Sequence, residues 1–179
     1  VTSSNAVKIV KSLPNKNIFF IPDKNLGRFV AEQVPEKNII LNDGCCPIHA
    51  KITAEQLLAE KENHPEALVL SHPECNADIL ALSDYTGSTA DIIAYARQSN
   101  ADEFIICTED GVNYKLITNN PEKRFLYPNP RPCCVDMKLN TIEAVLSVMQ
   151  KEDKEVFVED SVRTRALLPL ERMLEIAGK

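Results

Sequence analysis

Short apolar runs alternate along this chain with longer segments in which apolar residues recur at helical spacing. The runs are continuously apolar, which is typical of parallel strands covered on both faces. They occupy residues 18–21, 38–41, 67–70, 103–107, 124–127 and 155–158. Regular alternation of strands and helices predicts an α/β fold with a three-layer α-β-α architecture and parallel sheets.

The intervening segments carry apolar stripes and recognisable helix starts. Thr53 followed by Gln56 is the pattern of a capping box, and Thr141 stands at the start of another helix. A final helix is predicted over about residues 162–176. The stripes that we expect to face a core are Leu26, Phe29, Val30 and Val34; Ile92, Ile93 and Ala96; and Val145, Leu146 and Met149.

One block of the sequence occurs twice. The pair Cys45-Cys46 and the residues behind it return 88 positions later as Cys133-Cys134 and its followers. Residues 2–23 similarly resemble residues 88–109, with an offset of 86. Repetition at a nearly fixed period predicts small, pseudo-symmetric α/β units of about 85 residues each.

The repeat also predicts where the units begin and end. Residues 1–46 are expected to be the C-terminal half of a unit begun upstream, and residues 47–133 a complete unit. Residues 134–179 are expected to be a strand-helix segment that completes the first, truncated unit. Because the chain starts at Val1 without a methionine, we interpret it as a piece of a longer protein.

Composition narrows the possible partners and the compartment. A net charge of −6 and a pI near 5.2 argue against nucleic acid, since phosphate binding needs a basic face. No apolar run approaches the roughly 20 residues of a membrane span, so we expect a cytoplasmic protein. Six cysteines that include two adjacent pairs make a poor disulfide framework. Reduced thiols or metal ligands are the expected alternatives.

Polar residues that could carry chemistry follow several of the predicted strands, where α/β sheets bind ligands. The densest group is His72-Pro73-Glu74-Cys75. Pro73 restricts the backbone, so His72 and Glu74 hold fixed directions that suit general acid–base work. A capping turn with a hydrogen-bonded histidine is the plainer interpretation of the same residues.

Hydroxyl residues mark two predicted helix starts, and cysteines mark one corner of each repeat. Ser3 and the pair Ser88-Thr89 could bind phosphate or carboxylate, or could simply cap their helices. Cys46 and Cys134 recur at equivalent positions, which favours one shared metal ligand set over two buried structural thiols. Two thiolates do not complete a zinc site, and no C-x-x-C motif is present.

The ordered series of these motifs resembles the quinolinate synthase family, the A protein of bacterial NAD biosynthesis. The resemblance covers essentially the whole chain. It rests on Thr2-Ser3-Ser4-Asn5-Ala6, Pro22-Asp23-Lys24-Asn25-Leu26-Gly27, Gly44-Cys45-Cys46-Pro47-Ile48-His49, His72-Pro73-Glu74-Cys75, Gly87-Ser88-Thr89, Thr108-Glu109 and Cys134-Val135-Asp136-Met137-Lys138. It implies an enzyme with three similar α/β domains around a pseudo-threefold axis, each giving one cysteine to a [4Fe-4S] cluster.

The resemblance implies a reaction and assigns roles to residues of this chain. The enzyme would condense iminoaspartate with dihydroxyacetone phosphate to quinolinate, phosphate and water, with iminoaspartate supplied by L-aspartate oxidase. Cys46 matches the cysteine of the family's G-x-C-x-x-H motif and Cys134 that of C-x-x-M-K, with the third cysteine upstream. His72 and Glu74 would be catalytic. Substrate contacts would come from Ser3, His72, Pro73, Glu74, Ser88 and Thr89.

Two other classes of function stay open from the residues alone. A hydrolase or isomerase could use His72 and Glu74 without any metal, and it would keep its activity in metal-free protein. A two-repeat binding or redox-sensing module could use Cys46 and Cys134 as regulatory thiols, and mild oxidation would then join them as a disulfide.

Overall fold

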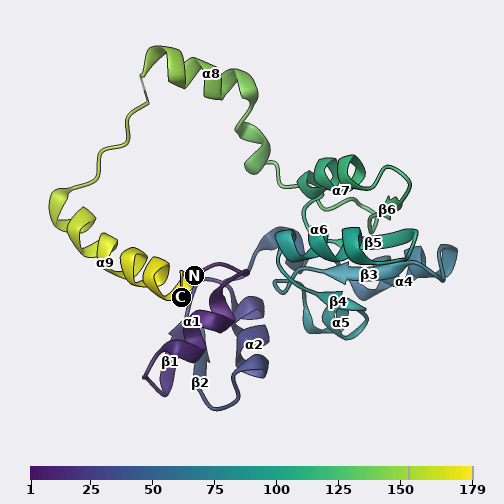
Figure 1. Ribbon diagram of the computed structural model, residues 1–179, viewed down its shortest axis with the longest axis horizontal. Coiled ribbons are helices and arrows are strands. Elements are labelled where there is room, and N and C mark those ends of the chain that lie inside the picture. Colours follow the sequence, from purple (N-terminus) through teal and green to yellow (C-terminus); the bar gives the residue numbers. More distant parts are fainter. Residues whose placement is uncertain (153, 179) are drawn as a thin grey trace. The chain divides into compact units, whose positions relative to one another are not determined.

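A computed structural model describes residues 1–152 and 154–178 of the chain (Figure 1). The described chain divides into two compact units, Val1–Cys133 and Cys134–Lys179. Asp153 and Lys179, which fall within the predicted segment 134–179, lie outside the described residues. The two units are described separately below.

The first unit alternates strands and helices along most of its length. Its elements are α1 (Ala6–Ser12), β1 (Asn17–Phe20), α2 (Lys24–Gln33), β2 (Asn38–Leu41), α3 (Pro47–Ala50), α4 (Ala54–Asn63), β3 (Leu68–Ser71), α5 (Ala77–Ala81), β4 (Tyr85–Thr86), α6 (Thr89–Gln98), β5 (Glu103–Cys107), η1 (Asp110–Val112), α7 (Asn113–Asn119) and β6 (Arg124–Leu126). All the strand pairs are parallel, which confirms the predicted α/β class.

A four-stranded sheet in the order β4-β3-β5-β6 forms the centre of the larger part of this unit. On one face, Leu57 of α4 and Ile79 of α5 pack against Ile105 of β5. On the other face, Ile92 of α6 and Leu116 of α7 pack in a second cluster with side chains of the sheet. Helices therefore cover both faces, as Figure 1 shows, and the predicted three layers are present.

The sheet formed by β1 and β2 is covered differently. Helices α1 and α2 both pack on one face, where Phe20 and Val30 are buried. On the other face Phe19 is 64% exposed and Ile40 is 48% exposed. The prediction that both faces of every strand would be covered is therefore wrong for this sheet within the described residues.

The two sheets repeat one local plan. Asn17 of β1 pairs with Asn38 of β2, and 86 positions later Glu103 of β5 pairs with Arg124 of β6. In each case two helices that flank the first strand in sequence pack on the same face. The segment α1-β1-α2-β2 is thus the counterpart of α6-β5-α7-β6, in the same register.

Polar caps fix the helix starts next to the sheet edge. Thr53 and Gln56 form the predicted capping box at α4, with hydrogen bonds of 3.3 and 3.0 Å. Ser88 and Asp91 form an equivalent box at α6. Such caps satisfy backbone N–H groups that have no partner inside the helix, which is worth about 1 kcal/mol each.

The second unit contains η2 (Met137–Leu139), α8 (Ile142–Lys151) and α9 (Asp160–Ala177). Thr141 caps α8 as predicted, accepting a hydrogen bond from the backbone N–H of Ala144. The expected inward stripe of Val145, Leu146 and Met149 is instead exposed, because no described core residue covers it. The predicted final helix is present, begins at Asp160 and contains Pro169.

The strand predicted over residues 155–158 is wrong. These residues form no helix or strand, because no described strand pairs with them. A continuous apolar run indicates that a strand is possible, but pairing with a neighbour decides whether one forms. None of the described helices combines the length and the apolar character that crossing a bilayer requires.

Candidate functional site

The carboxyl ends of three strands bring polar residues together at one edge of the first unit. Ser71 at the end of β3 pairs with Cys107 at the end of β5, so His72 and Thr108 emerge side by side. Asn25, in the first turn of α2, the helix that follows β1, donates a hydrogen bond of 2.9 Å from its side chain to the carbonyl of Glu74. These groups therefore lie at the edge of the sheet where the strands end, which is where the sequence analysis expected polar residues.

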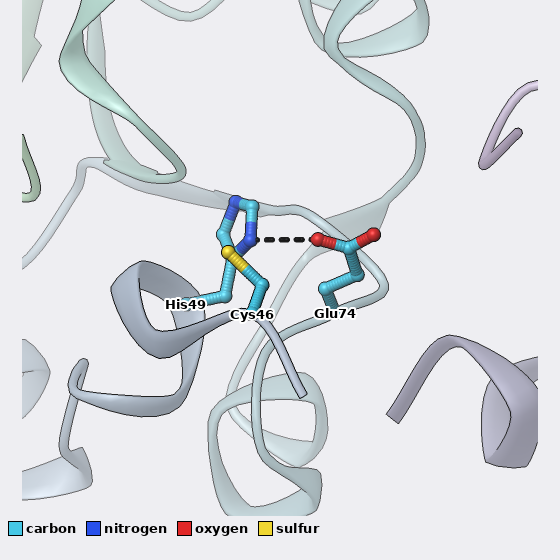
Figure 2. Close-up of side chains that lie close together, drawn as sticks. All are labelled: Cys46, His49 and Glu74. Atoms are coloured by element: carbon cyan, nitrogen blue, oxygen red, sulfur yellow. Dashed lines mark hydrogen bonds and ion pairs between the residues drawn. The ribbon is translucent and has the colours of Figure 1, made fainter. Parts of the chain in front are cut away.

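Glu74 lies between two histidines. Its Oε2 is 3.0 Å from Nδ1 of His49 and 3.8 Å from Nδ1 of His72. The imidazole rings are stacked, with centroids 4.4 Å apart and planes inclined by 11°. Figure 2 shows His49 and Glu74 facing each other with Cys46 beside them. Both histidines are buried, whereas the Glu74 side chain keeps 23% of its exposure.

The hydrogen-bond partners assign different donor and acceptor nitrogens to the two rings. The backbone N–H of Glu74 points at Nδ1 of His72, at 3.3 Å, so Nδ1 is an acceptor and Nε2 carries the hydrogen. That Nε2–H donates to Ser3 Oγ at 3.1 Å. In His49 the order is reversed, because an ionised carboxylate only accepts and Nδ1 must therefore donate to Glu74. Nε2 of His49 is then free to accept from the Thr108 hydroxyl, 3.0 Å away.

Burial and hydrogen bonding set the charges of this group. Burial lowers the pKa of His72 to about 4, with a further contribution from His49, so the ring is neutral near pH 7. The hydrogen bond from His49 lowers the pKa of Glu74 against the opposing effect of burial. The result is one ionised carboxylate that accepts a hydrogen bond from His49, lies beside a neutral His72 and is partly open to solvent.

Asp23 and Gly44 hold Cys46 next to this group. One Asp23 oxygen accepts from the N–H of Leu26 at 2.7 Å and caps α2, and the other accepts from the N–H of Cys46 at 2.6 Å. Gly44 passes so close to Pro22 that a Cβ there would collide with the Pro22 carbonyl oxygen. The loop that carries the cysteine pair is thereby fixed against the end of β1.

Cys46, His49 and Glu74 offer a sulfur, a nitrogen and an oxygen that all lie within 4.8 Å of one another. Thiolate and imidazole ligands suit transition metals such as zinc, iron and copper. Burial raises the pKa of the Cys46 thiol, and the carboxylates of Glu74 and Asp23 raise it further. A bound cation would reverse this balance by stabilising the thiolate. The group could therefore hold a metal.

The remaining thiols of the first unit differ in accessibility. Cys75 and Cys107 are fully buried, and burial raises the pKa of both, to about 12 for Cys107. Buried neutral thiols of this kind behave as apolar core residues. Cys45 and Cys133 are exposed. Cys133 also lies within reach of Glu109 and Asp110, in a second group with possible metal ligands.

Comparison with known proteins assigns the chain to a family. The family model described as Quinolinate synthetase A protein matches residues 1–175. The chain belongs to the quinolinate synthase family. The quinolinate synthase of Caldicellulosiruptor saccharolyticus is 49% identical over 176 residues, which are 98% of this chain and 58% of that relative. Those of Sulfurihydrogenibium sp. and Clostridioides difficile are both 46% identical, over 99% of this chain and 59% and 58% of their own lengths.

The residues suggested by the quinolinate synthase resemblance fall into two sets. His72, Glu74 and Ser3 are directly linked by contacts, and Pro73 is buried between the first two in sequence. Ser88 is engaged in its capping box, while Thr89, the first residue of α6, is exposed. Cys134 belongs to the second unit, so convergence of Cys46 and Cys134 stays a prediction.

The sequence analysis assigned no role to His49, Thr108 or Asp23, three residues of this candidate site. His49 stands three positions after Cys46, on the short helix α3, and that spacing was the available signal. Thr108 follows β5 directly and could have been found from the strand-end rule. Asp23 looks like an ordinary helix cap, and nothing in the sequence marks its second hydrogen bond to Cys46.

Proposed function

We propose that this chain provides much of the active site of a quinolinate synthase, which condenses iminoaspartate with dihydroxyacetone phosphate to quinolinate, phosphate and water. The observation that carries the proposal is the ionised Glu74 carboxylate held by His49, beside the Cys46 thiol. The chain spans 58% of the length of the Caldicellulosiruptor relative, so the complete activity requires residues beyond those described.

Glu74 is suited to accept the proton that must leave carbon or nitrogen when the two substrates are joined. Its lowered pKa keeps it ionised near neutral pH, and its partial exposure leaves it accessible to a small molecule. His49, backed by Thr108, orients the carboxylate by donating a hydrogen bond to it from Nδ1. His72 and Ser3 present a polar pair for the carboxylate or phosphate oxygens of the substrates.

The donor chemistry of the chain fits an iron–sulfur cluster. Cysteine thiolates are the usual cluster ligands, and Cys46 is a half-buried thiol beside the acid–base residues. We propose Cys46 and Cys134 as two ligands of a [4Fe-4S] cluster, the third coming from sequence outside this chain. A cluster with one open iron supplies a Lewis acid for the departure of oxygen groups. Cytoplasmic localisation and supply of iminoaspartate by L-aspartate oxidase belong to the same proposal.

The test compares two adjacent cysteines in the assembled enzyme. The chain is co-expressed with the part of the Caldicellulosiruptor relative that it does not match, reconstituted anaerobically with iron and sulfide, and assayed for quinolinate. Cys46→Ser is expected to lower both the iron content and the turnover severely, whereas Cys45→Ser, at an exposed position, leaves both unchanged. Equal effects of the two substitutions, or quinolinate formation without iron, would contradict the proposal.

A further inference from the structure

Three different kinds of metal ligand come together in the first unit from two separate loops. Cys46 is the residue before α3 and His49 lies three positions later, a spacing that brings two side chains to the same side of a helix. Glu74 approaches from the turn after β3, and its Oε2 is 3.0 Å from Nδ1 of His49. A sulfur, a nitrogen and an oxygen atom are therefore gathered in one place (Figure 2).

The separations of these atoms are close to those of a tetrahedral zinc site. Zinc bonds of about 2.0–2.3 Å place neighbouring ligand atoms about 3.3–3.8 Å apart. The three atoms lie within 4.8 Å of one another, so small side-chain rotations are enough to bring them to that arrangement. Three protein ligands leave a fourth position for water. The Glu74 side chain is 23% exposed, which gives an ion a route from solvent.

Hydrogen bonds around the three ligands already hold them in place. The N–H of Cys46 donates to Asp23 Oδ2 at 2.6 Å, which fixes the backbone that carries the thiol. Thr108 Oγ1 is 3.0 Å from Nε2 of His49, and both residues are buried. A histidine that binds a metal through one nitrogen usually donates its other N–H to an oxygen, and Thr108 supplies an oxygen at that position.

We propose that Cys46, His49 and Glu74 bind a single divalent transition-metal ion, zinc above all, in protein that carries no iron–sulfur cluster. The ion takes Cys46 Sγ, His49 Nδ1 and an oxygen of Glu74, and the Cys46 thiol releases its proton to solvent. Nδ1 of His49 gives up the hydrogen that it donates to Glu74. Nε2 then carries a hydrogen and donates it to Thr108, so metal binding reverses the roles of the two ring nitrogens.

The same ion keeps the proposed reaction from starting. It occupies Cys46, which we assign to the cluster, and it binds the Glu74 carboxylate, which we assign to proton transfer. Zinc and the cluster therefore exclude each other, and the zinc-loaded protein is an inactive form. This consequence rests on the proposed function, whereas the metal site itself rests on the geometry of the three side chains.

A second group of possible ligands, formed by Glu109, Asp110 and Cys133, is a poorer site. It contains no imidazole, and Cys133 is exposed. Nε of Arg131 lies 3.2 Å from Asp110 Oδ2, and Glu109 accepts a hydrogen bond of 2.7 Å from the N–H of Gly111. A cation would have to compete with the Arg131 guanidinium for Asp110, so we place the ion at the first group.

Metal titration of this chain alone tests the site. Cobalt(II) is the probe, because a thiolate ligand gives it an intense near-ultraviolet band, and zinc should displace it. Cys46→Ser should abolish the band and weaken binding by about 100-fold or more, whereas Cys45→Ser, at the adjacent exposed thiol, should change neither. Thr108→Val should weaken binding about 10–100-fold, and Thr108→Ser should recover most of the loss.

Two measurements on the wild-type chain make the result independent of how well the variants fold. X-ray absorption of the zinc-loaded chain should show one sulfur ligand, with nitrogen or oxygen as the others. In ¹H–¹⁵N spectra of the imidazole, zinc should move the hydrogen of His49 from Nδ1 to Nε2. Zinc bound without sulfur, or with the hydrogen still on Nδ1, would overturn the proposal.

The remaining outcomes separate this site from its rival and from the reaction. Loss of the cobalt band in Cys133→Ser, but not in Cys46→Ser, would assign the metal to the second group and overturn the proposal. In the assembled enzyme, zinc added before iron and sulfide should lower the cluster yield, and a chelator should restore it. An unchanged yield would refute the competition. A chain that binds neither metal would overturn the site, while the comparison of Cys46→Ser with Cys45→Ser in the assembled enzyme would still test the reaction.

Discussion

Thr108 Oγ1 lies 3.0 Å from Nε2 of His49, and both side chains are buried. The other ring nitrogen of His49 contacts Glu74 at the same distance. Thr108 is therefore the group that fixes the acceptor end of the imidazole and, through it, the direction of the carboxylate. Thr108 can in this way determine how the proposed base is oriented, through its hydrogen bond with His49.

Substitutions at Thr108 test this positioning role. Thr108→Val keeps the shape but removes the hydroxyl, and the loss should cost about 1–3 kcal/mol of unfolding free energy by leaving His49 Nε2 without its donor. Thr108→Ser restores a hydroxyl and should recover most of that loss. Urea unfolding measures the stability, and ¹H–¹⁵N spectra of the imidazole report the His49 tautomer. A valine variant with unchanged stability and an unchanged tautomer would contradict the role.

His72 should make the stability of the chain depend on pH. Its pKa is about 4 in the folded chain against 6.5 when unperturbed, so the unfolded state binds the proton first as the pH falls. The free energy of unfolding therefore begins to fall as the pH drops through about 7, and about 2 kcal/mol of it is lost between pH 7 and pH 5. His72→Gln should flatten this decline, while His64→Gln serves as a histidine control. Parallel pH profiles for the wild type and His72→Gln would show that burial does not depress this pKa.

Local patterns predicted a strand correctly wherever an apolar run was long and paired with a neighbouring strand. The predicted bounds of β2 and β5 are correct to the residue, because the apolar character of the run, its length and the polar residues that flank it agreed. Strand β4, Tyr85–Thr86, was missed because a two-residue strand exists only through its pairing with β3. The strand predicted over residues 155–158 failed for the converse reason, since pairing is a tertiary property that a single run does not encode.

The candidate site was predictable in part. The rule that ligands bind at strand ends found His72 and Glu74, which do lie together. It did not find His49, which reaches Glu74 from a helix in the loop after β2. The contact between His49 and Glu74, 25 positions apart, depends on how the loop after β2 is held in place. The hydrogen bond from the N–H of Cys46 to Asp23 holds this loop, and it has no sequence signature.

Glu74→Gln tests the base in the assembled enzyme. The amide keeps the size of the side chain but cannot accept a proton, so quinolinate formation should fall by about 10²–10⁴-fold. Iron content should remain at the wild-type level, because Glu74 is not a proposed cluster ligand. Glu122→Gln, at an exposed position, is the matched control and should leave turnover unchanged. Loss of iron together with activity would make Glu74 a structural residue or a metal ligand.

The counterpart positions Ile105 and Phe19 give a test of the repeat that needs no partner and no assay. Ile105 is fully buried, so Ile105→Ala should cost about 2–5 kcal/mol through lost burial and the cavity left behind. Phe19 is 64% exposed, so Phe19→Ala in the chain alone should cost less than about 1 kcal/mol, although Phe is the larger side chain. Denaturant unfolding of the two variants measures both values.

The same pair of variants shows whether Phe19 is exposed in solution. If another segment covered Phe19, Phe19→Ala would destabilise the chain nearly as much as Ile105→Ala does. A small cost at Phe19 beside a large cost at Ile105 would mean that the equivalence of the two sheets ends at their strand register and does not extend to what packs on them.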